Sequence, residues 1–234
     1  MIALNNVGVR AGAFTLANIT FTIPSGAFGV VVGAAGSGKT TMLEVIAGVR
    51  TATIGTVVLH QHTVTQWPPE KRGVGLVYQR GALFPHRTVR DNISWSTKSE
   101  SLHSSMVERL GIGALFGTPI AALSGGERQL VALARALVRV RSCLDRGEPA
   151  VLLLDEPFSA LDPRRKLATR DTVRELHRDW KLTTLMVTHD SAEARRADIA
   201  VLLDAGRVVQ SGPPLEMLQA PARDDVAYFL NGEG

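Results

Sequence analysis

Residues Gly33-Ala34-Ala35-Gly36-Ser37-Gly38-Lys39-Thr40 form the most informative stretch of this 234-residue chain. They match the pattern G-x-x-x-x-G-K-[ST], in which glycines let the backbone curl so that several N–H groups point at one phosphate. An apolar run, Gly29 to Val32, comes directly before this stretch, and a helix-like segment, Thr41 to Ala47, follows it. A phosphate loop needs this strand–turn–helix setting because the helix N-terminus adds its positive dipole end. The stretch therefore predicts a nucleoside triphosphate site in an α/β fold.

Each residue type in the loop has an expected task. Lys39 supplies a positive charge to the β- and γ-phosphate oxygens of ATP, and the hydroxyl of Thr40 is placed to ligate Mg²⁺. The alternative, a glycine-rich turn that binds nothing, is disfavoured by the flanking strand and helix. The residues expected to bind the nucleotide here are Gly33, Ala34, Ala35, Gly36, Ser37, Gly38, Lys39, Thr40 and Thr41.

A second motif, Leu152-Leu153-Leu154-Asp155-Glu156, ends an apolar run with two adjacent carboxylates. The C-terminal edge of an open α/β sheet is where ligands bind, so a strand here would deliver both acids to such a site. Asp155 is expected to hold Mg²⁺ through its water shell. Glu156 is expected to orient and polarise the attacking water as a general base. By itself the motif could equally be an ordinary charged strand end, and the phosphate loop favours the catalytic interpretation.

A third motif, Leu123-Ser124-Gly125-Gly126-Glu127-Arg128-Gln129, begins a predicted helix that runs through Leu137. Ser124 and Glu127 have the spacing of a capping box, which is a structural role. Gly125 and Gly126 also leave the helix N-terminus uncovered, which makes a second anion site far along the chain from the first. A head-to-tail dimer of two copies would use both sites, with each ATP between the loop of one copy and the Ser124 turn of the other.

The remaining sequence predicts the layout around these motifs. Apolar runs at Ala150–Leu154 and Thr184–Val187 have the continuous pattern of parallel strands that are buried on both faces. The segment from Ile2 to Thr22 alternates and predicts antiparallel strands with a turn at Gly12. Between Arg80 and Val140 helical periodicity dominates, which indicates an inserted helical lobe. Further predictions are short strands at Val57–Leu59 and Gly75–Val77, a surface loop at Arg139–Pro149, and a last helix at Pro214–Gln219.

Bulk composition limits the classes of function. Hydrophobic residues make up 45% of the chain and charged residues 21%, as in an ordinary globular protein. The net charge of +4 is scattered, so it gives no case for a nucleic acid partner. The single cysteine, Cys143, cannot form an internal disulfide. No apolar run approaches the roughly 20 residues that cross a bilayer, and the N-terminus lacks a signal-peptide layout, so any membrane role is expected to come through a partner.

In their order along the chain, the phosphate loop, LSGGERQ, LLLDEP and the histidine in VTHD resemble the ATP-binding subunits of ABC transporters. The resemblance implies an α/β fold: a P-loop NTPase core with a mostly parallel sheet, an N-terminal antiparallel β subdomain and an inserted α-helical subdomain. It places the core at residues 1–79 and 143–234 and the helical subdomain at about 80–142. The chain is also expected to lack the C-terminal regulatory domain of many relatives.

The resemblance also assigns roles that the residues alone would not. It makes Gln79 the residue that contacts Mg²⁺ and the attacking water, and His189 the residue that contacts the γ-phosphate. Asp162 lies in the loop that reaches across the dimer, and Phe14 occupies the position of the aromatic residue, often tyrosine in the family, that stacks on adenine. From the residues alone, a single histidine after a strand is more often a packing or capping residue, and Phe14 could equally be a core residue.

Residues 68–73 and 79–92 closely resemble bacterial importer subunits, whose substrates include molybdate, sulfate, iron, polyamines and thiamine. The expected function is therefore an ATPase that energises import, with molybdate/tungstate or another inorganic ion as the expected cargo. The alternatives are a thiamine or polyamine importer, an exporter motor, a non-catalytic nucleotide-binding regulator, or a soluble ABC ATPase outside transport. Expected partners are a second copy, membrane permease subunits and, indirectly, an extracytoplasmic substrate-binding protein. The expected location is peripheral, on the cytoplasmic face of the inner membrane.

Overall fold

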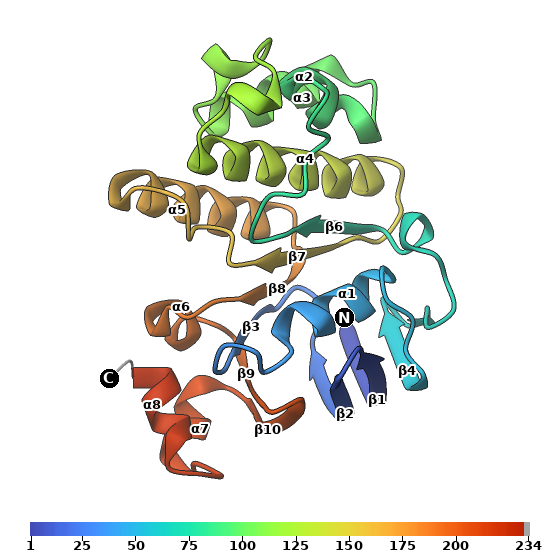
Figure 1. Cartoon of the computed structure of the whole chain (residues 1–234), viewed down its shortest axis with the longest axis vertical. Helices are drawn as coiled ribbons and strands as arrows, with labels where there is room; N and C mark the ends of the chain where they lie inside the picture. The colour runs from blue at the N-terminus through green and yellow to red at the C-terminus, as the bar shows by residue number, and fades with distance from the viewer. Residues whose placement is uncertain (232–234) are drawn as a thin grey trace. The chain divides into compact units, whose positions relative to one another are not determined.

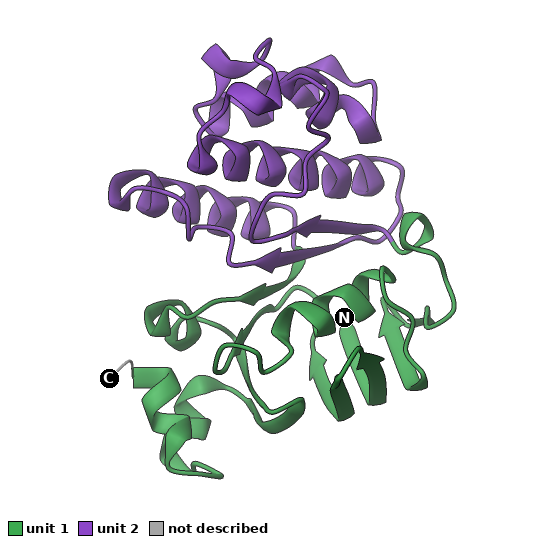
Figure 2. Cartoon of the chain, in the orientation of Figure 1, with its two compact units in different colours: residues 1–72, 182–234 green, residues 73–181 purple. Residues whose placement is uncertain are grey.

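The computed structural model describes residues 1–231. The chain divides into two compact units: unit 1 comprises residues 1–72 and 182–234, and unit 2 comprises residues 73–181 (Figure 2). The boundaries of these units differ from those of the predicted core and helical subdomain. Unit 2 contains the helices of the predicted lobe together with two strands and a further helix, so the lobe and part of the α/β layer form one compact body.

Unit 1 begins with the predicted antiparallel sheet, which has the strand order β2-β1-β4-β5 (Figure 1). Gly12 forms the turn between the first two strands with φ of 62°, in the left-handed region that glycine adopts without steric cost. One face of the sheet supplies core residues such as Ile19 and Ile23, both fully buried. The strands are β1 (Ile2–Ala11), β2 (Phe14–Ile23), β4 (Ile54–Leu59) and β5 (His62–Thr63).

Three parallel strands in unit 1 carry the phosphate loop. β3 (Phe28–Val32) lies between β8 (Thr183–Val187) and β9 (Ile199–Asp204), and β10 (Arg207–Gly212) pairs antiparallel with β9. Every residue of β3 and of β8 is buried, as the continuous apolar runs predicted. Because parallel strands end at the same edge of a sheet, the loops after β3 and after β8 emerge side by side.

Unit 1 also contains the helix after the phosphate loop and the last helices of the chain. The helix predicted at residues 41–47 begins two residues earlier, and the one predicted at Pro214–Gln219 is present. That helix is not the last one: α8 follows it, with Val226 and Leu230 fully buried. The helices are α1 (Lys39–Ala47), α6 (Ser191–Arg195), α7 (Pro214–Gln219) and α8 (Asp225–Asn231).

In unit 2 the long helix α4 (Gly125–Asp145) packs on the parallel pair β6 (Val74–Val77) and β7 (Val151–Asp155). Gly75 allows this close approach, because a Cβ at this position would lie 2.6 Å from the carbonyl oxygen of Ala136. The other α-helices of unit 2 are α2 (Val89–Ile93), α3 (Glu100–Arg109) and α5 (Pro163–Asp179). Unit 2 also has short 3-10 helices at Ser94–Ser96, Gly113–Leu115 and Ile120–Ala122. Unit 1 has one at Pro69–Lys71.

The prediction of a surface loop at Arg139–Pro149 is wrong for residues 139–145, because α4 continues to Asp145. Val140 and Cys143 are fully buried, so the apolar face of the helix extends well past Leu137. The helix stops where Gly147 adopts φ of 72°, which is the usual place and conformation for a glycine just beyond a helix C-terminus. The burial of apolar residues at helical spacing therefore determined the structure of this segment, although polar residues lie between them.

Within the described residues, no helix combines the length and the apolar character that crossing a bilayer requires.

Arg72 is a buried cation that stabilises unit 1. Its guanidinium donates hydrogen bonds to the carbonyl oxygens of Val45 and Ile46 at 2.9 Å, in the last turn of α1. It also reaches the carbonyls of Trp67 and Thr65 at 2.8 and 3.0 Å, and the residue is only 5% exposed. One side chain therefore satisfies carbonyls from a helix end and from a loop that are far apart in sequence.

We expect Arg72→Met to lower the free energy of unfolding by about 3 kcal/mol, because it leaves several buried carbonyls without a donor. Urea denaturation followed by circular dichroism measures the change. The matched control is Arg50→Met: Arg50 pairs with Glu44 in a partly exposed ion pair, and its loss should cost at most about 1 kcal/mol. Equal stabilities for the two variants would contradict the structural role of Arg72.

Candidate phosphate-binding and catalytic site

The predicted phosphate loop leaves β3 at Gly33 and enters α1 at Lys39. Gly33 has φ of 150°, and a Cβ there would lie 2.0 Å from the carbonyl oxygen of Leu203. Gly38 has φ of 101°, and a Cβ there would lie 2.7 Å from the ring of Phe14. Both positions therefore require glycine, one because backbone lies against it and the other because an aromatic ring does.

Lys39 is folded over the loop rather than extended into solvent. Its Nζ donates hydrogen bonds to the carbonyl oxygens of Gly33 and Ala34, both at 2.8 Å, and the residue is 8% exposed. In the part of the loop that precedes Ser37, residues Ala34, Ala35 and Gly36 are exposed. The loop thus presents its backbone outward around a fixed positive charge at a helix N-terminus, which is the arrangement that binds phosphate.

Ser37 supplies an independent sign that the loop is built for a ligand. Its hydroxyl oxygen is buried, and it has no hydrogen-bond partner among residues 1–231. A buried hydroxyl without a partner is costly and uncommon in folded proteins. An anion in the loop would supply the missing acceptor, so the residues present fit a phosphate group.

Phe14, the predicted adenine-stacking residue, lies beside the loop. It begins β2 and is half-buried. Its ring rests against the backbone of Gly38, and a Cβ at Gly206 would lie 3.3 Å from its Cζ. The ring is therefore held next to the nucleotide loop with part of its surface exposed, as stacking on a base requires.

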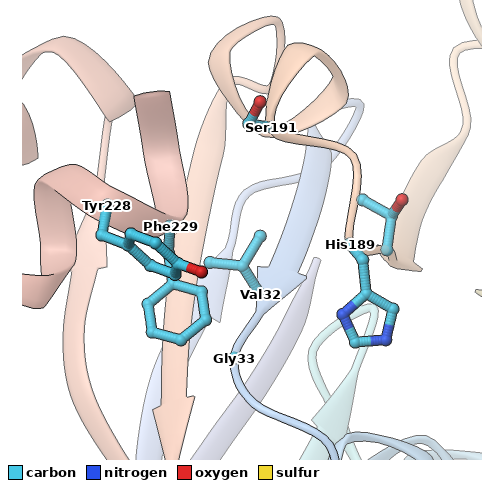
Figure 3. A pocket seen from close by; sticks show the side chains of 7 residues that line it. Val32, Gly33, His189, Ser191, Tyr228 and Phe229 are labelled. Atoms are coloured by element: carbon cyan, nitrogen blue, oxygen red, sulfur yellow. The ribbon is translucent and has the colours of Figure 1, made fainter. Parts of the chain in front are cut away.

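A cavity of about 260 Å³ lies beside the start of the loop and is lined by His189 (Figure 3). His189 is exposed and follows β8, so it lies at the same edge of the sheet as Gly33. Figure 3 shows its ring on one side of Val32 and Gly33, with Tyr228 and Phe229 on the other. The lining residues are Val32, Gly33, Thr188, His189, Ser191, Tyr228 and Phe229.

The aromatic pair Tyr228 and Phe229 was not predicted as part of the site. The two rings are edge-to-face with centroids 5.3 Å apart, and α8 is tied to α6 because Arg195 donates to the carbonyls of Leu230 and Asn231, both at 2.9 Å. The sequence signal was the helical spacing of Val226 and Leu230, which could have predicted α8 but not its position beside His189.

In unit 2 the two predicted carboxylates lie at the end of β7. Asp155 is the last residue of the strand and is 3% exposed. Glu156 follows with φ of 47°, a left-handed conformation that is rare for a residue with a side chain. Strain of this kind persists only where neighbouring contacts enforce it, and it is common at functional sites.

Gln79 lies at the same edge of the β6–β7 pair. β6 ends at Val77, in parallel register with Leu154 of β7, and Gln79 follows in an exposed turn closed by a hydrogen bond from Gly81 N–H to Tyr78 O at 2.9 Å. The polar groups after the two strands thus emerge at the same edge of this strand pair.

The Ser124 turn has the predicted capping box. Ser124 N–H donates to the Glu127 carboxylate at 2.8 Å, and Glu127 N–H donates to the Ser124 hydroxyl at 3.2 Å. Hydrogen bonds from the backbone N–H and from the side chain of Ser124 to the carboxylate lower the pKa of Glu127. The carboxylate is therefore ionised and the box is intact at neutral pH, and the box is lost as the pH falls through that pKa. Gly126 packs against the next predicted loop, since a Cβ there would lie 2.8 Å from the carbonyl of Ala160.

Asp162 has a local structural role as well as its predicted one. It is the N-cap of α5, where its side chain accepts a hydrogen bond from Arg165 N–H at 3.0 Å.

The predicted site residues fall into two groups. Unit 1 contains Phe14, the loop Gly33–Thr41 and His189, and unit 2 contains Gln79, Ser124–Gly126, Asp155, Glu156 and Asp162.

Comparison with protein families and curated proteins gives consistent matches. The family model described as ABC transporter matches residues 16–159. The chain is 38% identical to the sulfate/thiosulfate import ATP-binding protein CysA of Mycolicibacterium paratuberculosis, over 98% of this chain and 64% of that protein. It is 40% identical to the CysA protein of Nocardia farcinica, over 98% and 70%. It is 39% identical to the maltose/maltodextrin import ATP-binding protein MalK of Photorhabdus laumondii, over 98% and 63%. The chain thus spans somewhat less than two thirds of two of these three relatives.

Solved structures with the same fold include two dimeric forms of an ATP-binding cassette. One, a post-hydrolysis state bound to ADP and Pi, has a TM-score of 0.79 and 25% identity. The other has a TM-score of 0.80 and 26% identity, and each match covers 91% of this chain and 98% of the other. The predicted fold class, with its antiparallel β sheet, parallel strands and helical insert, is confirmed.

Proposed function

Because the chain belongs to the ABC transporter family, we propose that it is the subunit that binds and hydrolyses ATP to energise import through such a transporter. The observation that carries the proposal is the phosphate loop. Its buried Lys39 and the Ser37 hydroxyl, which has no hydrogen-bond partner within residues 1–231, form a site that an anion would complete. A domain with this loop and the motifs of Asp155, Glu156 and Ser124 has the parts for phosphoryl transfer to water.

In this proposal the loop residues Gly33 to Thr41 hold the phosphates of ATP and Phe14 stacks on the adenine. Lys39 neutralises the β- and γ-phosphate oxygens. Its bonds to the carbonyls of Gly33 and Ala34 keep the charge in place before the ligand arrives. Preorganised charge of this kind stabilises the transition state because it need not reorient during the reaction.

Thr40, Gln79 and Asp155 are the residues proposed to hold Mg²⁺, Asp155 through the water shell of the ion. Their hydroxyl, amide and carboxylate oxygens are groups that this ion and its bound water prefer. When bound, Mg²⁺ neutralises charge that develops on the phosphate oxygens. Asp155 suits this task because it is buried at a strand end, where its position is fixed by β7.

Glu156 is the proposed general base. As the oxygen of water forms its bond to the γ-phosphorus, the bond from that phosphorus to the β–γ bridging oxygen breaks, and ADP and inorganic phosphate result. Glu156 accepts a proton from the attacking water. His189 contacts the γ-phosphate, and Gln79 helps to orient the water.

Two copies of the chain are proposed to form a head-to-tail dimer. Ser124, Gly125 and Gly126 of one copy would contact the ATP held by the loop of the other, and Asp162 would lie in the loop that crosses between them. Loss of the γ-phosphate would remove the group that joins the copies. The dimeric neighbours, one of them with ADP and Pi bound, support this arrangement.

The proposed further partners are membrane permease subunits and, through them, an extracytoplasmic substrate-binding protein. The proposed location is the cytoplasmic face of the inner membrane. For the cargo we propose an inorganic oxyanion, with molybdate or tungstate as the specific candidate. The names of the CysA relatives support an oxyanion, whereas the MalK relative supports a sugar as the alternative.

The test is reconstitution of this chain in lipid vesicles with membrane permease subunits and a substrate-binding protein. We expect Mg²⁺-dependent ATP hydrolysis that rises when the permease and its binding protein are added with molybdate, and uptake of molybdate into vesicles. Hydrolysis without stimulation by any oxyanion, but with stimulation by maltose, would support the sugar. Absence of hydrolysis in the complete complex would contradict the proposed function.

Ser37→Ala separates ligand binding from folding. We expect ADP affinity to fall about tenfold, because a hydrogen bond to a charged group is lost. The free energy of unfolding without nucleotide should not fall, since the hydroxyl has no partner among the described residues. Calorimetric titration with ADP measures the first quantity and urea denaturation the second.

Ser96→Ala is the matched control, because Ser96 also has a buried hydroxyl without a partner in the described part of the chain. It lies in unit 2, whereas the phosphate loop belongs to unit 1, so its replacement should leave ADP affinity unchanged. Unaltered ADP affinity in Ser37→Ala would show that the hydroxyl does not contact the phosphates.

A further inference from the structure

Glu156, the proposed base, has a backbone conformation that depends on its surroundings. Its φ of 47° lies in the left-handed region, where a side chain crowds the backbone. The direction of its carboxylate depends on this conformation, because φ and ψ fix the direction of the Cα–Cβ bond. The contacts that hold the backbone of Glu156 therefore also set the direction of its carboxylate.

The carbonyl oxygen of Glu156 is held by three donors. Gln129 Nε2 donates to it at 2.7 Å, which is the shortest of the three bonds. The hydroxyl and the N–H of Ser159 donate to it at 3.0 and 3.2 Å. Of the two donor residues, Gln129 is 2% exposed and Ser159 is exposed. The bond from Gln129 is therefore the one that water does not compete for.

The side-chain amide of Gln129 bridges both ends of the turn that follows the base. Its nitrogen holds the Glu156 carbonyl, and its oxygen accepts a hydrogen bond from Ala160 N–H at 2.9 Å. Only an amide side chain of this length offers a donor and an acceptor at its tip for these two groups. The turn is thus fixed from outside itself, by a residue of α4.

The helix that carries Gln129 also begins at the Ser124 turn. Near its N-terminus Gly126 lies against the carbonyl of Ala160, where a Cβ would be 2.8 Å away. α4 therefore contacts the turn after Glu156 twice, once through a close backbone approach and once through the amide of Gln129. The contacts all lie within unit 2.

We propose that Gln129 is a positioning residue that holds the backbone of Glu156 in its left-handed conformation and so aims the carboxylate at the attacking water. This inference rests on the proposed function, since it concerns the rate of the hydrolytic step. Gln129 touches neither water nor nucleotide in this role and acts through the backbone of Glu156.

The decisive variant is Gln129→Glu, which keeps the shape but replaces the donor with an oxygen. A carboxylate would repel the Glu156 carbonyl while still accepting from Ala160 N–H. We expect kcat for ATP hydrolysis to fall about 100-fold, as misplacement of a catalytic group does. KM for ATP and the dissociation constant for ADP should stay unchanged, because Gln129 does not contribute to the phosphate loop.

Gln210→Glu is the matched control. Gln210 makes the same kind of bridge, donating to Ala220 O and accepting from Ala222 N–H, both at 2.9 Å. It lies in unit 1, at β10, and its replacement should leave kcat unchanged. Should Gln129→Glu fail to fold, Gln129→Met removes both hydrogen bonds of the amide without adding a charge, and should lower kcat by a similar factor without a change in KM.

The outcomes separate this inference from the proposed function. If the wild-type protein hydrolyses ATP and a folded Gln129→Glu or Gln129→Met variant keeps its kcat, the positioning role is overturned. A higher KM with unchanged kcat would also overturn it. If the wild-type complex itself shows no hydrolysis, the proposed function fails instead.

Discussion

Glu156→Gln is expected to reduce ATP turnover about 10³-fold, which is within the range that a general base contributes. Glutamine has nearly the same shape and can keep its backbone contacts with Gln129 and Ser159. It cannot accept a proton at neutral pH, so only the proton transfer from water is lost. ATP binding should persist, and the ATP-bound dimer should accumulate because the γ-phosphate is no longer removed.

Phosphate release measures the turnover, and gel filtration with and without Mg-ATP measures the dimer. Glu148→Gln is the matched control: the same change of group, in the same unit, at an exposed residue paired with Arg146. It should turn over ATP like the wild-type protein. If Glu156→Gln kept wild-type turnover, another group would have to serve as the base.

Ser124→Arg is expected to abolish nucleotide-dependent dimerisation. Ser124 is exposed at the N-terminus of α4, and in the proposed dimer this turn meets the phosphates held by the other copy. A long side chain there would fill the space that the triphosphate needs. ADP binding to a single copy should be unchanged, since the phosphate loop is in the other unit.

The variant also loses a helix cap, which costs about 1 kcal/mol, and its control must lose one too. Ser99 is the N-cap of α3, accepts from Leu102 N–H at 3.4 Å and is exposed. Ser99→Arg therefore reproduces the loss of a cap in the same unit, and it should leave dimerisation intact. The Ser124→Arg and Ser99→Arg substitutions are best made in the Glu156→Gln variant, where the ATP-bound dimer is expected to persist long enough to be measured. Undisturbed dimers of Ser124→Arg would argue against the sandwich.

The local structure of the phosphate loop and of the Ser124 turn could be predicted from the sequence because each is set by interactions between neighbouring residues. The phosphate loop lies between a buried strand and a helix, and glycines at Gly33 and Gly38 have the positive φ values that such a loop needs. The capping box of Ser124 and Glu127 spans a single helical turn. In both cases all the determining residues lie within a few positions of one another.

Some predictions failed where distant residues decide the structure. The end of α4 was placed too early because its polar residues suggested a loop, whereas Val140 and Cys143 are buried in unit 2. The helix α8 was missed, and with it the aromatic pair that lines the cavity beside His189. A short amphipathic segment is a weak signal until the surface that buries it is known.

The sequence by itself determined the family, the strand–loop–helix unit from β3 to α1 and the capping box at Ser124, because these follow from the order of neighbouring residues. Only the tertiary structure revealed that Phe14 lies against Gly38 and that Gln129 holds the carbonyl of Glu156, 27 residues further along the chain. The physical reason is that a hydrogen bond or a ring contact depends on distance in space, and the packing of α4 on its strands sets that distance.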